Sequence, residues 1–168
     1  MLLSEAETRA LTTKILALSK AESCLVTIGG YENRQIRYAQ NMATTNGAPG
    51  GIEIGVESHF GKRSGSASGT DLTDDGLAAL VAAAEETAKR APENPEFMPP
   101  IGPQIYGPGT SFIPATQATS SDMLAAAIAP VLQAAQARNL QASGFLEIGI
   151  SFSSFATSAG LFVHDKST

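Results

Sequence analysis

The sequence predicts an α+β domain in which a mainly antiparallel sheet carries about three helices on one face. Two patterns support this fold class. Short segments with alternating apolar and polar residues follow one another, separated by turn-forming residues, as in consecutive hairpins. Three longer segments repeat apolar residues at helical spacing. The chain has 168 residues, a length that fits one domain, 1–168.

The three helices are recognised by their N-terminal caps. Ser4 with Glu7 three residues later forms a capping box. Thr73 precedes two aspartates, which the positive end of the helix dipole favours. Pro130 lies inside the third helix, and we expect it to kink that helix because its nitrogen cannot donate a hydrogen bond. The expected helices cover residues 4–20, 73–91 and 121–139, and Leu124, Ile128, Val131, Leu132 and Ala135 mark the buried side of the last one.

Alternation predicts the strands in the same way. Cys24, Val26 and Ile28 share one side of the first strand. We expect a hairpin connection at 29–33 and a second turn at 44–51, where glycine and asparagine gather. The segment 64–69 is built from serine, glycine and alanine, which predicts a strand whose backbone another group approaches closely. The expected strands cover residues 23–30, 34–42, 52–60, 64–69, 144–152 and 161–163.

Residues 91–119 hold seven of the nine prolines, so no regular element is expected there. A loop of this length is unusual inside a compact domain. Its apolar side chains favour a crossover pinned to the domain over a free linker; they are Phe97, Met98, Ile101, Ile105, Tyr106, Phe112 and Ile113.

The composition excludes several classes of protein. Eleven basic and sixteen acidic residues give a net charge of −5, which argues against direct nucleic-acid binding. No apolar run approaches the roughly 20 residues of a membrane span. The N-terminal residues turn acidic at once and lack the basic region of a signal peptide. Cys24 is the only cysteine, so no intrachain disulfide is possible and a cytoplasmic location is expected.

The residues themselves indicate no catalytic centre and no metal or other cofactor. His59 and His164 are the only histidines, no His-Glu-x-x-His pair exists, and we expect both side chains to be exposed. No Gly-x-Ser-x-Gly nucleophile elbow is present. The Gly61-Lys62 pair lacks the first glycine and the Ser/Thr of a phosphate-binding loop.

Four residues remain as candidates for lining a substrate path. Arg37 and Asn41 lie on the more polar side of one expected strand, where they either face water or grip a peptide backbone or carboxylate through the guanidinium fork. Lys62 and Arg63 form a basic turn before the small-residue strand. That turn is either a solubilised hairpin or a place where an extended peptide adds to the sheet.

An ordered set of motifs resembles a known family. It includes Ile-Arg-Tyr-Ala-Gln-Asn at 36–41 and Gly-Lys-Arg-Ser-Gly-Ser at 61–66. The spacing and order of the whole set resemble the N-terminal domain of the TldD/PmbA family, proposed metallopeptidases that are also called modulators of DNA gyrase. The other segments of the set are 18–21, 44–47, 72–80, 91–96, 102–104, 142–145 and 158–162.

The resemblance implies that this chain is the non-catalytic N-terminal domain of a zinc metallopeptidase acting on unfolded or modified peptides. In the peptidase members a His-Glu-x-x-x-His helix and a distant cysteine bind zinc in a C-terminal domain, and that motif is absent from these residues. The resemblance also implies a homo- or heterodimer with a family member. The alternative is a non-catalytic partner subunit or peptide-binding interaction module.

Overall fold

A single antiparallel sheet forms the body of the molecule. The computed structural model describes residues 2–107 and 109–168, so Met1 and the loop proline Pro108 lie outside the described residues. The strand order is β4-β3-β1-β5-β6, and β2 pairs with the remaining length of β1. The predicted α+β class with a mainly antiparallel sheet is confirmed. The strands are β1 (Ser23–Ala39), β2 (Met42–Gly47), β3 (Gly50–Phe60), β4 (Arg63–Gly69), β5 (Gly144–Thr157) and β6 (Phe162–Ser167).

The helices begin where their caps predicted. The Ser4 hydroxyl accepts the backbone N–H of Glu7, whose carboxylate accepts the backbone N–H of Ser4. The Thr73 hydroxyl accepts the N–H of Gly76. The last long helix continues through Pro130 and ends three residues earlier than expected. The helices are α1 (Glu5–Leu18), α2 (Asp74–Arg90), α3 (Pro114–Gln117) and α4 (Ser121–Gln136).

The hairpin predicted at 29–33 is wrong, because β1 is one strand of 17 residues. Its middle pairs with β3 on one side and with β5 on the other, which leaves no turn there. Gly30 permits this continuity: a Cβ at that position would lie 2.3 Å from the ring of Phe152, its partner on β5. The chain reverses at Gln40 and Asn41 instead, both with positive φ, as a two-residue hairpin requires.

The turn predicted at 44–51 is also mostly strand. Residues 44–47 belong to β2, and 50–51 already belong to β3. Only Ala48 and Pro49 interrupt the two strands, and the carbonyl of Pro49 still accepts the N–H of Asn33 on β1 at 2.8 Å. The chain therefore follows one side of β1 along almost its whole length.

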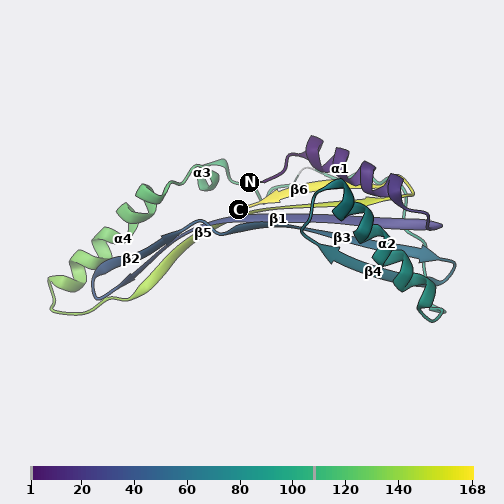
Figure 1. The fold of residues 1–168 in the computed structure, drawn as a ribbon. Helices are drawn as coiled ribbons and strands as arrows, with labels where there is room; N and C mark the ends of the chain where they lie inside the picture. Colours follow the sequence, from purple (N-terminus) through teal and green to yellow (C-terminus); the bar gives the residue numbers. More distant parts are fainter. Residues whose placement is uncertain (1, 108) are drawn as a thin grey trace.

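Two separate cores lie along the sheet. Under α1 and α2, side chains such as Ile15, Val26 and Leu77 form the larger core. Under α4, only Ile36, Leu124 and Ile128 are fully buried, with Tyr38, Leu132, Leu146 and Ile148 packed around them. Val131, expected on the buried side of this helix, is instead 48% exposed. We call the second part the arm: β2, α4, residues 33–39 of β1 and residues 144–149 of β5 (Figure 1).

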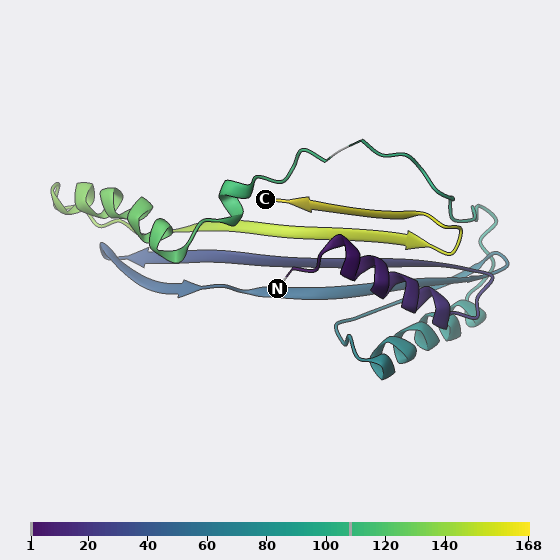
Figure 2. The ribbon, with the colours of Figure 1, turned by 90° about the horizontal axis from the view of Figure 1, so that it is seen from above.

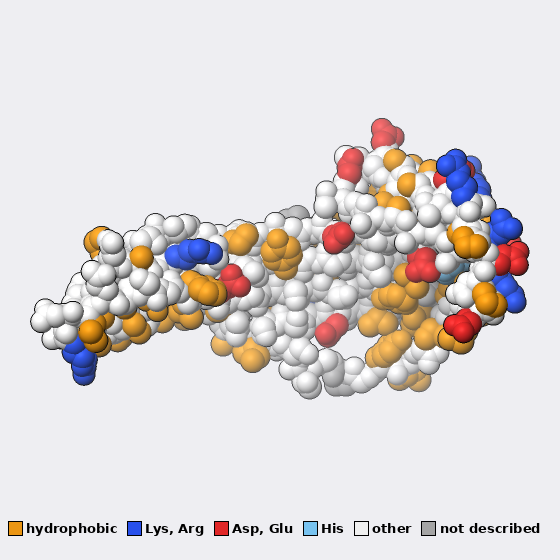
Figure 3. All heavy atoms as spheres, turned by 90° about the horizontal axis from the view of Figure 1, so that it is seen from below, with side chains coloured by type: hydrophobic (Ala, Val, Ile, Leu, Met, Phe, Trp, Pro, Cys, Tyr) orange, Lys and Arg blue, Asp and Glu red, His pale blue; other side chains and the backbone are white. Residues whose placement is uncertain are grey.

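All three long helices pack on the same face of the sheet. The side chains that contact them come from the even-numbered positions of β1, among them Val26, Ile28 and Ile36. Because strand side chains alternate between faces, the odd-numbered positions project from the opposite face. No helix of the described chain covers that face, which we call the open face (Figure 3).

The small-residue strand β4 approaches α2 closely, as predicted. A Cβ on Gly65 would lie 2.1 Å from the backbone nitrogen of Ala88 and 2.6 Å from the carbonyl oxygen of Ala84. Glycine at this position therefore lets the helix backbone rest directly on the strand.

The loop at 91–119 runs beside β6, outside the edge of the sheet (Figure 2). It is attached mainly through its backbone: Asn94 donates to the carbonyl of Lys62, and the carbonyls of Ile101 and Ser111 accept from Thr157 and Thr168. The prediction that its apolar side chains pin it is wrong for most of them, since Met98, Ile101, Ile105, Tyr106 and Ile113 are exposed. The short helix α3 was not expected; it begins at a proline, whose fixed φ suits a first helical turn.

Candidate functional site on the open face of the sheet

The open face carries a shallow hollow of about 670 Å³ near the middle of the molecule. Its floor is formed by the central strand β1 and by the neighbouring positions of β3, β4 and β5. The lining side chains are small or absent, so the backbone itself is accessible; they include Thr27, Gly29, Gly55, Ser68 and Ser153. Figure 3 shows this region mostly white, because hydroxyl side chains and backbone dominate it.

Two larger side chains give the hollow its chemical character. Tyr31 is about half exposed and offers both an aromatic ring and a phenol hydroxyl. Glu53 lies opposite Gly29 in the register and supplies an exposed carboxylate. Such a surface can accept hydrogen bonds from backbone N–H groups or ammonium groups and can stack against a flat side chain.

Arg37 and Asn41 take different positions at the end of the arm. Arg37 is exposed on the open face, opposite Phe145 on β5. Asn41 lies in the β1–β2 turn, where its side chain donates to the carbonyl of Leu140 at 2.8 Å and accepts from the N–H of Ala142 at 2.7 Å. Asn41 therefore holds the loop before β5 against the hairpin.

Lys62, in the β3–β4 turn, and Arg63, the first residue of β4, lie at the opposite end of the molecule. Arg63 donates to the carbonyl of Lys89 at the end of α2 and lies 3.8 Å from the carboxylate of Glu93. Near this turn, His59 of β3 pairs with Ser23 of β1. Ser23 lies fourteen positions before Arg37 on the same strand, so about 46 Å of strand separates Lys62 and Arg63 from Arg37 and Asn41. The structure does not bring the four predicted residues together.

The expectation that His59 is exposed is wrong. Its side chain is 5% exposed and is covered by the ring of Phe97, 5.0 Å away between centroids. Nε2 lies 2.9 Å from a carboxylate oxygen of Glu57 and Nδ1 lies 3.0 Å from the hydroxyl of Ser23. Since a carboxylate only accepts, Nε2 donates to Glu57, and in the neutral imidazole Nδ1 then accepts from the hydroxyl of Ser23. The arrangement attaches the start of the long loop to the sheet.

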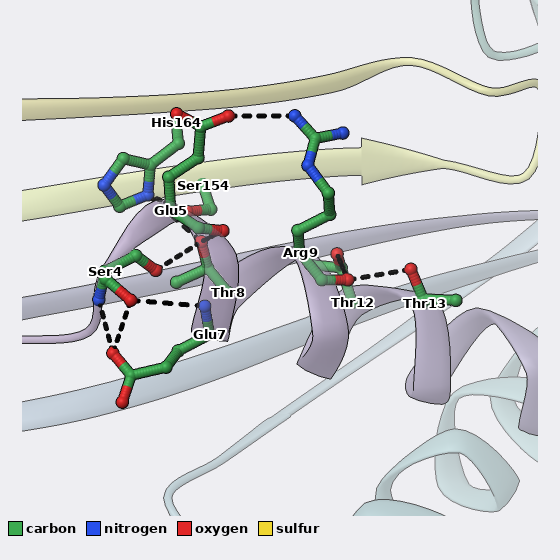
Figure 4. A network of polar contacts seen from close by, with 9 residues as sticks. All are labelled: Ser4, Glu5, Glu7, Thr8, Arg9, Thr12, Thr13, Ser154 and His164. Carbon is green, nitrogen blue, oxygen red and sulfur yellow. Dashed lines mark hydrogen bonds and ion pairs between the residues drawn. The ribbon is translucent and has the colours of Figure 1, made fainter.

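The same expectation is wrong for His164, which is half-buried beneath the first turn of α1 (Figure 4). Its Nδ1 lies 2.7 Å from the hydroxyl of Ser154 and 3.1 Å from that of Thr8, and its ring stacks on Phe152. Nε2 is buried and has no hydrogen-bond partner in the described chain. Burial is the main cause that lowers the pKa of His164, and the charge of Lys166 adds to it.

No group of three or more His, Cys, Asp or Glu side chains suited to a metal ion occurs among residues 2–107 and 109–168. The two histidines lie on opposite faces of the sheet, because His59 aligns with odd-numbered and His164 with even-numbered positions of β1. No helix in the described residues is long and apolar enough to cross a membrane.

Sequence reasoning missed the residues that line the hollow. The glycines at 29 and 30 were interpreted as a turn, although glycines inside an alternating segment also mark a place where another group approaches the strand. A second signal was present in β3, where Gly55 stands between Ile54 and Val56 on the polar side of the alternation.

No family model matches the chain, and no curated protein matches it either. Its fold occurs in solved structures, three of which are compared below. TldE from Thermococcus kodakarensis superposes with a TM-score of 0.76 at 13% identity and covers 98% of this chain. Proteins named as proposed modulators of DNA gyrase, from Thermotoga maritima and Bacteroides thetaiotaomicron, superpose with TM-scores of 0.78 at 10% and 12% identity and cover 95% and 99% of it.

These matches use 37–39% of the length of the three structures, so this chain spans well under half of each. At such low identity the likeness concerns the arrangement of the elements and extends over nearly all of this chain. The sequence resemblance is thereby confirmed at the level of the fold: the chain has the fold of a domain of TldE and of the gyrase-modulator proteins.

Proposed function

We propose that this chain is a non-catalytic domain of a TldD/TldE-type zinc metallopeptidase that acts on unfolded or modified peptides in the cytoplasm. The observation that carries this proposal is the fold likeness, which covers 95–99% of this chain but only 37–39% of the similar structures. In this proposal the catalytic chemistry belongs to a second domain. A homo- or heterodimer with a family member completes the enzyme.

The described residues of this chain do not fit a zinc site. Zinc in a peptidase needs about three protein ligands around one point. His59 and His164 are engaged with hydroxyl and carboxylate partners and lie on opposite faces of the sheet. Cys24 is buried, and burial raises the pKa of its thiol, which disfavours the thiolate that zinc binds. We therefore assign zinc to the second domain.

The role proposed for this chain is to line part of the substrate path. The hollow on the open face offers accessible backbone, hydroxyl groups, Tyr31 and Glu53, which suit an extended peptide better than a compact ligand. Arg37, Asn41, Lys62 and Arg63 remain candidates for lining that path. The negative net charge supports a peptide substrate over direct binding of nucleic acid.

A second candidate function is a non-catalytic interaction module. The exposed apolar side chains of the long loop favour it, since Met98, Ile101 and Ile105 lie in water in the isolated chain and would gain from being covered. In that case the open face and the loop bind a partner protein, and no peptidase activity accompanies them.

The reading frame after Thr168 distinguishes the two candidates. A following domain with a His-Glu-x-x-x-His helix supports the peptidase; a stop codon or a domain without zinc ligands supports the interaction module. At the protein level, we expect the 168-residue chain to hold no stoichiometric zinc after dialysis and to cleave no unfolded peptide. One zinc per chain that is lost in His59→Ala or His164→Ala would contradict the assignment of zinc to a second domain.

The longer protein allows a test of the substrate path. Arg37→Ala is expected to lower peptide turnover several-fold while the zinc content stays unchanged. Arg138→Ala serves as the matched control, because Arg138 is an exposed arginine two residues after the end of α4. Unchanged turnover in Arg37→Ala would remove Arg37 from the path.

A further inference from the structure

In the hollow of the open face, four side chains surround a position that has none, Gly29. Thr27 and Tyr31 lie two positions before and after it on β1. Glu53 on β3 and Ser153 on β5 are its partners in the register of the sheet. All five residues line the hollow. Neighbours about 7 Å away along the strand and about 5 Å away across it therefore enclose Gly29 on four sides.

The fold itself does not require a glycine at position 29. Its φ is not positive, and a Cβ there would meet only the carbonyl oxygen of Phe152 at 3.9 Å, an ordinary contact. Gly30 differs, because a Cβ at that position would lie 2.3 Å from the ring of Phe152. Glycine weakens a strand, and one without a packing reason marks a place where a ligand can approach the backbone closely.

The carboxylate of Glu53 is not used to stabilise the described chain. Glu57, four positions later on the same side of β3, binds Nε2 of His59 at 2.9 Å. Glu53 is exposed and has no hydrogen bond or ion pair with another described residue. The exposed hydroxyls of Thr27 and Ser153 likewise have no partner in residues 2–107 and 109–168. One negative charge and two hydroxyl oxygens thus remain available as acceptors around Gly29.

The aromatic ring beside these acceptors restricts the kind of ligand. The ring of Tyr31 leans towards β3, since a Cβ on Gly51 would lie 3.6 Å from it. It is therefore placed on the same side as Glu53, where an aromatic face attracts a cation. A metal ion such as calcium requires six or more oxygen ligands and would find a single carboxylate here.

An ammonium group fits this set of acceptors better than a guanidinium. The lysine ammonium carries three donors around one charged point, whereas the arginine guanidinium is a planar fork that suits two oxygens of one carboxylate. The acceptors of the hollow come from three different strands and surround one point above Gly29. Their arrangement matches donors that diverge from a single atom.

We propose that the hollow holds the side chain of a lysine from an extended peptide. Its ammonium lies over Gly29 and donates to the carboxylate of Glu53. The hydroxyls of Thr27 and Ser153 accept its other hydrogens, and its methylene stem crosses the ring of Tyr31. The inference rests on the proposed function, in which the hollow lies on the substrate path, and it adds a substrate class: unfolded peptides that contain lysine.

Binding of short peptides to the 168-residue chain tests the proposal without any peptidase activity. The probe is a peptide of glycine and serine with one central lysine and both ends blocked, so that lysine carries its only charge. Matched probes carry norleucine, Nε-acetyl-lysine or arginine instead. Because the hollow is shallow and open to water, we expect a dissociation constant on the order of 1 mM for the lysine peptide, measured by NMR titration. We expect binding at least threefold weaker for norleucine and acetyl-lysine, with arginine between.

Two variants locate the binding site. Glu53→Gln removes the charge and should bind the lysine and norleucine peptides alike. Gly29→Ala places a methyl group where the ammonium is proposed to lie, and should weaken lysine binding at least threefold. The matched controls are Glu147→Gln, an exposed carboxylate on another strand, and Gly69→Ala, which pairs with the buried Ile54. Both controls should keep the preference for lysine, and circular dichroism verifies that each variant is folded.

Several results would overturn the lysine assignment. They are equal binding of the lysine and norleucine peptides by the wild type, no binding of either, or a full preference for lysine in Glu53→Gln. A lysine-free peptide with a free N-terminus that binds more tightly than the lysine peptide would assign the hollow to the α-amino group instead. The proposed function fails separately: a longer protein without peptidase activity would leave the lysine preference of this chain intact.

Discussion

The carboxylate of Glu85 accepts a hydrogen bond from the backbone N–H of Lys20 at 2.5 Å. Glu85 lies on α2, and Lys20 is the second residue after α1. The same carboxylate accepts the hydroxyl of Ser19 at 3.1 Å. Glu85 is 5% exposed, so a buried side chain of one helix satisfies backbone at the end of the other. This contact fixes the relative position of the two helices that cover the larger core.

Replacing Glu85 by alanine is expected to destabilise the chain by about 2–3 kcal/mol, because a backbone N–H and a hydroxyl in a partly buried site lose a charged acceptor. Glu85→Gln keeps a hydrogen-bond acceptor at this position and should therefore lose less stability than Glu85→Ala. The matched control is Glu86→Ala, one residue on, whose exposed carboxylate pairs only with Lys89 and Arg90 and whose loss should change stability little. Urea unfolding measures all three; equal stability of Glu85→Ala and Glu86→Ala would contradict the linking role.

Gly65→Ala should lower the free energy of unfolding by about 2–3 kcal/mol. The added methyl group meets the backbone of α2 at Ala84 and Ala88, which cannot move without displacing the helix. Gly69→Ala on the same strand is the control, since its methyl group meets only the end of Leu80 at 3.6 Å, an ordinary contact. Thermal unfolding of the two variants compares them directly, and a Gly65→Ala chain as stable as Gly69→Ala would show that the helix adjusts freely.

The lowered pKa of His164 makes the fold sensitive to acid. Burial disfavours the imidazolium in the folded chain, so the unfolded chain binds more protons just below its ordinary pKa of about 6.5. Stability is therefore complete above that pH and falls as the pH drops from about 6.5 through the lowered folded value. The positive charge of Lys166 also disfavours protonation of His164, whereas the negative charges of Glu5 and Asp165 favour it.

His164→Gln removes this titration while keeping a side chain that can bond to Ser154 and Thr8. We expect the loss of stability between pH 7.5 and pH 5.5 to be smaller in the variant than in the wild type. The difference is limited to about 1.4 kcal/mol per pH unit, the most that one proton contributes. Urea unfolding at several pH values measures it, and parallel curves for the two proteins would exclude His164 as the source.

The long loop should be cut by chymotrypsin first at Tyr106. No backbone hydrogen bond to another segment holds the described residues between Ile101 and Ser111, and the side chains of Ile105 and Tyr106 are exposed. Phe97, packed on His59, is the internal control within the same loop. Mass spectrometry of early fragments identifies the first cut; cleavage at Phe97 before Tyr106 would contradict the attachment described for the start of the loop.

The helix starts and the alternation of the strands were predictable because they depend on residues close in sequence. Ser4 caps a helix through Glu7, and Thr73 caps one through Gly76, each only three residues away. The alternation of β1 likewise follows from neighbouring residues: Cys24, Val26 and Ile28, predicted to share one side of the strand, all lie in the larger core. The close approach of β4 was predicted from the absence of side chains.

The errors concern contacts between residues far apart in the chain. Gly30 was expected in a turn but lies within a continuous strand, where the ring of Phe152, 122 positions later, packs over it. His59 is buried because the ring of Phe97, in the long loop, packs against it. Asn41 was expected to face a substrate or water, but its side chain is hydrogen-bonded to the backbone of Leu140 and Ala142. None of these partners is visible from the local pattern of polar and apolar residues.

The sequence by itself determined the class of fold, the caps of the first two helices and which residues at the start of β1 share one side, since propensity, capping and alternation act over a few residues. Only the tertiary structure decided that β1 runs unbroken under two separate cores and that the helices leave the opposite face uncovered. It also placed Arg37 and Lys62 at opposite ends of the molecule. The physical reason is that strand pairing and side-chain packing join segments more than a hundred residues apart, and their register follows from how the whole chain buries its apolar surface.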